Sequence, residues 1–452
     1  MLSLKNIIVI GGNAAGPAAA AKAKRVAPDS NVVMFEAGNF ISTGTCELPY
    51  VLSGEIKNYE DIVFYNPESF EKEKGVKVLL NHYVEKIDRI KKTVTVRNLV
   101  SNQTFEQSYD RLILATGSRA KKVPSLPNNL KNVCSLKSVQ DLILIKNYLQ
   151  NNRVRNILIM GAGYIGLEIA DALKTNGYNV TVAEKEKLPM PGSDGEIQHL
   201  ILDLLQKEGV KFLGRILNPK FIINDGKLQS VNFDGRIIDY DLLLTAVGFE
   251  PNNDLAVGAK LQTGRYGGIK VDQKLRASDP NIYAAGDCIE VINKITNKHE
   301  FIPIATYAQQ YGHIAGENAA GGNSFVQPVV KNIAVKIFDK CLVTVGLNSS
   351  EAAVNRFNFA SVNSVAPNLV KVMPGSEKVF GKILFEKSTK RILGASFFGR
   401  SEVIGFGDMI SSFIHNKIKA SELLNINYNY TPPLSPFINL LSILGRKIEK
   451  EK

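Results

Sequence analysis

Cys46 is the residue of this sequence best placed to act as a reagent. It lies in ISTGTCELPY, residues 41–50, between small polar residues and a Glu-Leu-Pro segment. Ser42, Thr43 and Thr45 are residue types that cap helices, and proline is favoured in a first helical turn, so we expect a helix to begin at the cysteine. Backbone N–H groups at a helix N-terminus stabilise a thiolate and lower the pKa of the thiol. The sequence therefore predicts a reactive cysteine here rather than a buried, inert one.

The other three cysteines, Cys134, Cys288 and Cys341, are far apart in the sequence. No CxxC pair occurs and none of the five histidines belongs to an HxxxH pair, so the pattern predicts neither a metal site nor a local dithiol. We expect Cys134 and Cys341 to be packing residues, and Cys288, beside Asp287, to lie near a cofactor. The apolar run at the N-terminus is too short for an export signal, which favours a reducing cytoplasm, where structural disulfides are rare.

A glycine-rich loop, GAGYIG at residues 161–166, follows the apolar run NILIM and opens a helical pattern. Glycines at this spacing let the backbone approach a pyrophosphate at the helix N-terminus. Glu184 follows Gly166 by 18 residues, where a carboxylate binds the ribose hydroxyls and favours NADH over NADPH. Lys185 and Lys187 weaken that preference. The segment is predicted to bind a nicotinamide dinucleotide.

A second loop of the same kind, GGNAAG, stands at residues 11–16 after the run NIIVI. Glu36 follows Gly16 by 20 residues and again ends an apolar run. Two such loops, each with its acid, suggest two cofactors that exchange a hydride, typically a nicotinamide and a flavin. Cys46 comes ten residues after Glu36, which would bring it to the flavin.

The elements around these residues predict an α/β protein. Strand, glycine turn, helix and strand follow one another from residue 6 and again from residue 156, which indicates parallel sheets. DRLILATG, DYDLLLTAVG and NIYAAGDC are further strands that end on glycine turns, at the sheet edge where ligands bind. From about residue 326 the pattern alternates and favours antiparallel strands. In the tail, Ser435 and Pro436 are expected to start a helix whose apolar face holds Phe437, Leu440, Leu441 and Leu444.

The charge is strongly positive, +12 with a pI near 9.3. The lysines are dispersed and no nucleic-acid-binding spacing occurs, so we expect no nucleic-acid partner. No apolar run is long enough to span a membrane, and no membrane partner is expected. A basic surface suits a small polyanionic substrate better.

Several segments together resemble the single-cysteine branch of the pyridine nucleotide–disulfide oxidoreductases. They are VIGGNAAG, CELPY, ILATGSR, GAGYIGLE, TAVGFEPN, SDPNIYAAGDC and YTPPLSP. This branch includes coenzyme A-disulfide reductases, NADH oxidases, NADH peroxidases and persulfide reductases. The resemblance implies two Rossmann-like domains and a C-terminal α+β dimerisation domain. Their expected bounds are residues 1–120 with 245–325 for FAD, 121–244 for NAD(P)H and 326–452 for the dimer.

The resemblance also implies roles for individual residues. Cys46 would cycle between thiolate and mixed disulfide, and Tyr430 of a partner subunit would approach the substrate sulfur. FAD would be bound by Gly11, Gly12, Ala15, Gly16, Glu36, Thr116, Gly117 and Asp287. NADH or NADPH would be bound by Gly161, Gly163, Tyr164, Ile165, Gly166, Glu184 and Gly248, with Glu168 nearby. A substrate such as coenzyme A disulfide would contact Lys22, Arg25, Ser42 and Thr45.

Differences between this sequence and the family pattern reduce the number of family activities that we expect it to have. The dithiol reductases carry a CxxxxC pair and a C-terminal His-Pro motif, and both are missing here. Ala14 stands where peroxidases and oxidases carry a histidine, and Thr45 stands where disulfide reductases often carry asparagine. The sequence thus favours an FAD-dependent reductase of a small disulfide or persulfide. A water-forming NADH oxidase and a non-enzymatic flavin-bound redox sensor are the alternatives.

Overall fold

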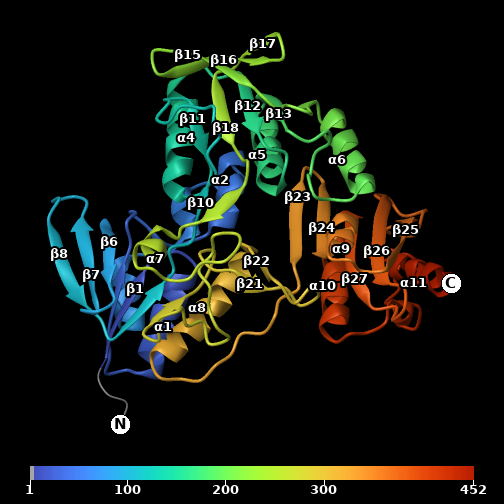
Figure 1. Ribbon diagram of the computed structural model, residues 1–452. Helices are drawn as coiled ribbons and strands as arrows, with labels where there is room; N and C mark the ends of the chain where they lie inside the picture. The colour runs from blue at the N-terminus through green and yellow to red at the C-terminus, as the bar shows by residue number, and fades with distance from the viewer. Residues whose placement is uncertain (1–4, 452) are drawn as a thin grey trace. The chain divides into compact units, whose positions relative to one another are not determined.

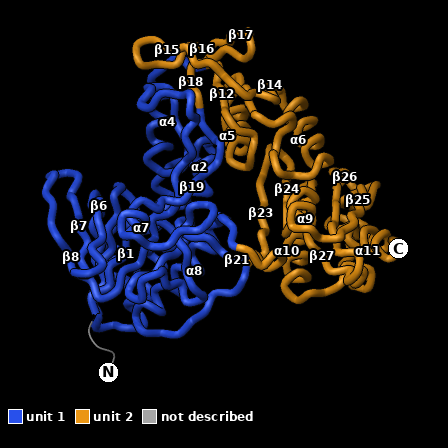
Figure 2. The backbone as a smooth tube through the Cα atoms, viewed as in Figure 1, with its two compact units in different colours: residues 1–154, 244–292, 299–328 blue, residues 155–243, 293–298, 329–452 orange. Residues whose placement is uncertain are grey.

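The computed structural model describes residues 5–451. The chain forms two compact units, coloured separately in Figure 2. The first comprises residues 1–154, 244–292 and 299–328, and the second comprises residues 155–243, 293–298 and 329–452. Within the described residues no helix has the length and hydropathy needed to cross a membrane.

The first unit is built on a five-stranded sheet in the order β20-β9-β1-β2-β5. All four strand pairings in it are parallel. Its strands are β1 (Asn6–Ile10), β2 (Asn31–Phe35), β5 (Lys77–Leu79), β9 (Arg111–Leu114) and β20 (Ile282–Ala284). Most residues of β1, β2 and β9 are buried. The sequences of these strands are therefore continuous apolar runs rather than alternating ones. The predicted parallel α/β architecture is confirmed.

Two helices of the first unit, α1 (Ala15–Val26) and α8 (Ala305–Ala319), pack at very short range (Figure 1). A Cβ atom on Gly312 would lie 2.3 Å from the carbonyl oxygen of Ala15, and one on Gly316 would lie 2.1 Å from that of Ala19. Only glycine fits at these two positions. The close contact fixes the start of α1, and therefore the first glycine loop, against a second rigid helix.

The remaining elements of the first unit are shorter. A three-stranded antiparallel sheet consists of β6 (His82–Asp88), β7 (Thr93–Asn98) and β8 (Thr104–Ser108). Two-stranded pairs are β3 (Ile41–Thr43) with β4 (Val63–Tyr65), β10 (Ser118–Ala120) with β19 (Phe249–Pro251), and β21 (Val291–Ile292) with β22 (His299–Glu300). The others are β11 (Val133–Ser135), η1 (Thr45–Glu47), α2 (Leu48–Ser53), η2 (Tyr59–Ile62), α3 (Pro67–Lys74), α4 (Val139–Asn151) and α7 (Asp254–Gly258).

The second unit begins with a repeat of the same βαβ plan. β12 (Asn156–Met160), β13 (Asn179–Ala183) and β14 (Lys211–Leu213) are parallel neighbours. They are joined by α5 (Tyr164–Thr175) and α6 (Gly195–Lys207). An antiparallel sheet of β15 (Lys220–Asn224), β16 (Lys227–Phe233) and β17 (Arg236–Asp239) follows. The division between the units falls within β18 (Leu242–Thr245).

The C-terminal part of the second unit is a five-stranded sheet in the order β23-β24-β27-β26-β25. Its strands are β23 (Asn332–Ile337), β24 (Lys340–Gly346), β25 (Phe359–Pro367), β26 (Lys378–Glu386) and β27 (Ile392–Gly399). All of its pairings are antiparallel, as the alternating sequence predicted. The accompanying helices are α9 (Ser349–Val354), α10 (Glu402–His415), η3 (Ala420–Leu424) and α11 (Leu440–Lys450).

The predicted start of the tail helix is wrong. α11 begins at Leu440, and the side chain of Asn439 caps it by accepting a hydrogen bond from the Leu441 N–H at 2.9 Å. Leu440, Leu441 and Leu444 are buried as expected, but Phe437 is 77% exposed because it precedes the helix. Ser435 and Pro436 lie instead in an irregular segment in which the Ser435 hydroxyl donates to the carbonyl of Asn429. The spacing of the apolar residues therefore predicted the buried side chains Leu440, Leu441 and Leu444 correctly, whereas the predicted capping residue was wrong.

A buried ion cluster lies inside the second unit. The Lys382 ammonium, 7% exposed, is 3.0 Å from carboxylate oxygens of both Asp194 and Glu196. Asp194, 6% exposed, also accepts a hydrogen bond from the Ser349 N–H at 3.0 Å. The cluster links β26 to the segment that enters α6.

We expect Lys382→Met to destabilise the protein by about 3–5 kcal/mol, because the Asp194 carboxylate would be left buried without a counter-ion. The melting temperature measured by calorimetry should fall by several degrees. Lys378→Met, at an exposed position of the same strand, is the matched control and should change it little. Equal melting temperatures for the two variants would show that the cluster contributes no stability.

Candidate functional site

The first glycine loop is shaped by contacts that admit only glycine. Gly11 has a φ of +106°, and a Cβ on it would lie 2.1 Å from the Ala115 carbonyl oxygen. A Cβ on Gly16 would lie 1.8 Å from the Gly11 carbonyl oxygen. No side chain caps the start of α1, where Ala14 is the N-cap residue. The first N–H groups of this helix are therefore available to an anionic ligand.

The carboxylate of Glu36 holds this loop from the end of β2. One of its oxygens accepts a hydrogen bond from the Gly12 N–H at 2.6 Å, and the other accepts from Gly38 at 2.7 Å. Burial raises the pKa of Glu36, and the hydrogen bonds from the backbone oppose that shift. The acid thus lies at the loop, as predicted, and it retains lone pairs for ribose hydroxyls.

The second loop repeats this construction. Gly161 also has a φ of +106°, and the Ala162 N–H donates to a Glu184 oxygen at 2.8 Å. The other Glu184 oxygen accepts from Glu186 at 3.2 Å, and the side chain is buried. A Cβ on Gly163 would meet no atom within 4 Å, so the backbone is open to a ligand at this glycine. The two loops therefore share one design, with backbone N–H groups at a helix start that suit the phosphates of a dinucleotide.

Cys46 lies on a segment that is tied directly to the first loop. The Ser42 N–H donates to the Gly12 carbonyl at 2.8 Å, and the Thr43 hydroxyl donates to the Asn13 side chain at 3.0 Å. Cys46 itself is exposed, in the short helix η1. These bonds hold Ser42 and Thr43 against the loop that would bind the flavin. The exposed thiol follows them by a few residues in the sequence.

The expected capping by Ser42, Thr43 and Thr45 is wrong. The N-cap of η1 is Gly44, that of α2 is Glu47, and neither makes a side-chain capping bond. Ser42 and Thr43 belong instead to β3, which pairs with β4, and Thr45 lies within η1. Ser42 and Thr43 were misassigned because the Ser42 N–H and the Thr43 hydroxyl bond to the glycine loop, a contact that sequence spacing does not reveal. A proline in the first turn of α2 was predicted correctly.

The other three thiols lie in different surroundings. Cys288 is fully buried, and its thiol donates to the carbonyls of Leu114 and Ala285 at 3.4 and 3.3 Å. Burial raises the pKa of Cys288 to about 11 and that of Cys134 to about 11. Burial also raises the pKa of Cys341. These three are packing thiols, protonated at neutral pH.

We expect one equivalent of iodoacetamide to be incorporated per folded chain at pH 8, at Cys46. Because raised pKa values keep Cys134 and Cys288 protonated until the pH approaches about 11, they should be labelled only after unfolding. Peptide mass spectrometry locates the label, and Cys46→Ser provides the unlabelled control. Labelling of Cys288 in the folded protein would contradict the assignment.

Asp287 is the centre of a second polar cluster in the first unit. One of its oxygens accepts from the Ser118 hydroxyl at 2.8 Å and lies 3.4 Å from the Lys137 ammonium. That ammonium also lies over the Phe249 ring, 4.2 Å from its centroid. No sequence pattern indicated Lys137, which stands 150 residues from Asp287 and in no motif. The Lys137 ammonium supplies a positive charge beside Asp287, the acid predicted to bind FAD.

Thr116 and Gly117 lie on the turn after β9. The Thr116 hydroxyl donates to the Asn252 carbonyl at 2.6 Å, and the Asn252 amide donates back to the Thr116 carbonyl at 2.8 Å. Gly117 has a φ of +68° and open space at its Cβ position. The reciprocal bonds fix this turn near the first loop, since the Ala115 carbonyl abuts Gly11.

Other predicted residues are distributed over both units. Gly248, φ +102°, belongs to the first unit, whereas Gly161, Gly163, Tyr164, Ile165, Gly166 and Glu184 belong to the second. The Tyr164 hydroxyl is 2.8 Å from that of Thr344. Burial, and to a smaller extent the negative charge of Asp171, raises the pKa of Glu168 to about 7. Tyr430, also in the second unit, is 49% exposed and meets the Phe437 ring edge-on.

The predicted substrate cations lie on α1. Lys22 forms an ion pair with Glu317 of α8 at 2.9 Å, and Arg25 is exposed. Burial, followed by the charges of Arg25 and Lys22, lowers the pKa of His313. A polyanion is therefore a suitable ligand for this surface of α1.

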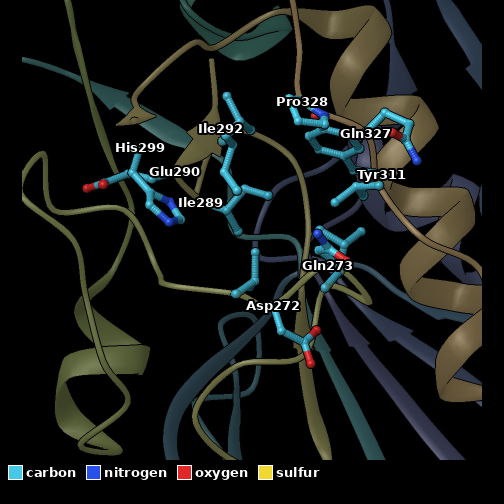
Figure 3. A pocket seen from close by; sticks show the side chains of 13 residues that line it. Asp272, Gln273, Ile289, Glu290, Ile292, His299, Tyr311, Gln327 and Pro328 are labelled. Carbon is cyan, nitrogen blue, oxygen red and sulfur yellow. The ribbon is translucent and has the colours of Figure 1, made fainter. Parts of the chain in front are cut away.

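A small cavity in the first unit is a separate feature. Figure 3 shows Ile289, Ile292 and Tyr311 along its wall, with His299 nearby. Its volume is about 40 Å³, the scale of a few water molecules and far below that of a dinucleotide. Among the described residues, no cluster of three or more His, Cys, Asp or Glu side chains could hold a metal ion.

The two-loop arrangement agrees with comparison to known proteins. Residues 5–312 match the family model of the pyridine nucleotide-disulphide oxidoreductases. The chain belongs to this family. It is accordingly an FAD-dependent oxidoreductase that uses NAD(P)H.

Three relatives differ in the acceptor that their names imply. The chain is 32% identical to an NADH oxidase of Methanocaldococcus jannaschii, with 98% of each chain covered. It is 28% identical to a coenzyme A disulfide reductase of Staphylococcus aureus, over 98% of this chain and all of the other. The structure of an NAD-dependent persulfide reductase from A. fulgidus matches with a TM-score of 0.94 at 30% identity, covering 99% of this chain and 83% of that one.

Proposed function

We propose that this flavoenzyme reduces a small disulfide or persulfide, of the coenzyme A-disulfide type, through Cys46 alone. The observation that carries the proposal is the exposed Cys46 thiol on a segment bonded to the first glycine loop at Gly12 and Asn13. The three other thiols are held protonated by burial. A single exposed thiol supports chemistry in which the substrate supplies the second sulfur.

In the proposed reaction the Cys46 thiolate attacks one sulfur of the substrate, and the substrate S–S bond breaks. The first thiol leaves with a proton, and Cys46 is left in a mixed disulfide. Two electrons from NAD(P)H and one proton then release the second thiol and restore the thiolate. FAD, when bound at the first loop by the residues around Glu36, supplies the route by which a hydride becomes an electron pair for sulfur.

The proposal divides the chain into the domains expected from the sequence. Residues 1–120 with 245–325 would bind FAD, residues 121–244 would bind NAD(P)H, and residues 326–452 would bind a second subunit.

The exposed apolar side chains around Tyr430, namely Leu434, Phe437 and Ile438, support an interface with a second subunit. Tyr430 of the partner subunit would then supply the proton to the leaving thiolate. A solution mass of twice the chain mass is expected from light scattering, and a monomer would refute the interface.

Coenzyme A is the acceptor that the charge distribution favours. Its phosphates carry several negative charges, and Arg25 presents an exposed positive charge on α1. Arg25→Glu should raise KM for coenzyme A disulfide by about tenfold and leave KM for a neutral disulfide unchanged. Equal effects on both substrates would remove the argument for a polyanion.

A water-forming NADH oxidase is the second candidate, since the archaeal relative at 32% identity has the name NADH oxidase. Steady-state oxidation of NADH and NADPH with coenzyme A disulfide, coenzyme A persulfide, polysulfide, peroxide or O₂ separates the two. We expect the disulfide or persulfide to give the highest kcat/KM. NADH consumption that tracks O₂ and does not respond to disulfides would instead establish the oxidase.

A further inference from the structure

The backbone of each glycine loop is held by a residue from the segment that follows the acid of that loop. In the first loop, the Gly12 carbonyl accepts a hydrogen bond from the Ser42 N–H at 2.8 Å. In the second loop, the Ala162 carbonyl accepts one from the Met190 N–H, also at 2.8 Å. Ser42 and Met190 both have a positive φ, +50° and +52°, and each stands six residues after its acid. The two segments are therefore equivalent.

The bond from Met190 orients the part of the second loop that is open to a ligand. A peptide group is planar and trans, so its N–H points away from its carbonyl. The Ala162 carbonyl and the Gly163 N–H belong to one peptide group, and a Cβ on Gly163 would meet no atom within 4 Å. By holding the carbonyl, the Met190 N–H also fixes the direction of the Gly163 N–H, a donor that suits a phosphate.

The equivalence of the two segments extends to a residue four positions further along the chain. This residue is Cys46 after Ser42, and Asp194 after Met190. Cys46 is exposed, whereas the Asp194 side chain is 6% exposed. Asp194 is the N-cap residue of α6, yet its carboxylate makes no capping bond. Because aspartate is among the preferred capping residues, the bond that it forgoes indicates a different partner.

That partner is Lys382 of β26, in the same unit (orange in Figure 2). The Lys382 ammonium lies 3.0 Å from one Asp194 oxygen and donates to the two Glu196 oxygens at 3.0 and 3.1 Å. That Asp194 oxygen accepts no hydrogen bond from the described residues, so the ammonium charge compensates it. A second anchor of this segment is the Asn348 side-chain amide, which donates to the Gly192 carbonyl.

The anchored segment, residues 190–194, is bonded internally. The Met190 carbonyl accepts hydrogen bonds from the Ser193 N–H at 3.0 Å and from the Gln198 side chain at 3.2 Å. Met190 itself is 2% exposed. A displacement of Asp194 would therefore also displace the Met190 N–H, and with it the backbone of the second glycine loop.

We propose that Lys382 is a positioning residue for the nicotinamide dinucleotide, although it lies on β26 and outside both glycine loops. It holds Asp194, and through residues 190–194 it keeps the Gly163 peptide group in one orientation. A loop that is already ordered loses less conformational entropy when its ligand binds, so the ion pair raises the affinity for the dinucleotide. The inference rests on the proposed use of the second loop for NAD(P)H.

The test compares nucleotide affinity with flavin content. Lys382→Met should raise the Kd of the purified holoprotein for NAD⁺ about tenfold, in a calorimetric titration well below the melting temperature. Its ratio of flavin to protein absorbance should not change, because the first glycine loop belongs to the other unit. A purely structural role of Lys382 would lower the melting temperature and leave this Kd unchanged. Lys378→Met, at an exposed position of the same strand, is the matched control.

Asn348→Ser removes the second anchor without disturbing a buried charge. The Asn348 side chain also caps α9 by accepting a hydrogen bond from the Glu351 N–H at 2.8 Å, and serine can make the same cap. We expect the Kd for NAD⁺ to rise about threefold at an unchanged melting temperature. This variant decides the question if Lys382→Met does not fold. A wild-type Kd in every folded anchor variant would overturn the inference.

Gly161→Ala distinguishes failure of the inference from failure of the proposed site. Gly161 has a φ of +106°, which side chains rarely adopt, so this variant alters the second loop itself. It should weaken NAD⁺ binding by more than about tenfold. Wild-type affinity in Gly161→Ala would show that the second loop is not the nucleotide site. If Gly161→Ala loses affinity and the anchor variants do not, only the positioning role of Lys382 is wrong.

Discussion

Cys46→Ser should lower kcat/KM for disulfide reduction by about a thousandfold or more, because serine cannot form the mixed disulfide. FAD binding should be retained, since Ser42 and Thr43, not the thiol, make the bonds to the first glycine loop. Flavin absorbance verifies that the variant is loaded, and stopped-flow mixing with NADH shows that the flavin can still be reduced.

Cys341→Ser is the matched control for this experiment. Cys341 is a half-buried thiol of the second unit whose pKa burial raises, so its loss should leave disulfide turnover within about twofold of wild type. Disulfide activity that survived in the Cys46 variant and disappeared in the Cys341 variant would reverse the assignment.

Gly16→Ala should remove FAD from the protein. A Cβ at this position would lie 1.8 Å from the Gly11 carbonyl oxygen, so the loop and the first turn of α1 must separate. A displacement of that size destroys the ligand-facing geometry of the loop and costs several kcal/mol of stability. We expect the purified variant to retain less than about a tenth of the wild-type flavin, measured by the ratio of flavin to protein absorbance.

Gly258→Ala controls for the loss of a glycine as such. Gly258 is exposed at the end of α7, and a Cβ on it would meet no atom within 4 Å. This variant should bind FAD fully. Full flavin retention by Gly16→Ala as well would show that the first loop is not the flavin site.

The features predictable from the sequence are those encoded within short segments. Each glycine loop and its acid belong to one βαβ unit, so the run of apolar residues, the glycine spacing and Glu36 or Glu184 sufficed to place them. The antiparallel pairing of the C-terminal sheet followed in the same way from alternation along β23 and β24. In these segments, local pattern and tertiary contacts agree.

The features missed depend on contacts between distant residues. Ser42 and Thr43 were assigned as helix caps, but they bond to a loop about 30 residues earlier. Lys137 reaches Asp287 across 150 residues, and no periodicity connects them.

The proposed reaction requires that Cys46 alone form a mixed disulfide with the substrate. The direct measurement is peptide mass spectrometry of the holoprotein after anaerobic mixing with coenzyme A disulfide and quenching in acid. We predict one coenzyme A thiol per chain, attached to the peptide containing Cys46 and released when NADPH or NADH is added. Turnover of the disulfide with no adduct on Cys46, or with the adduct on another cysteine, would contradict it.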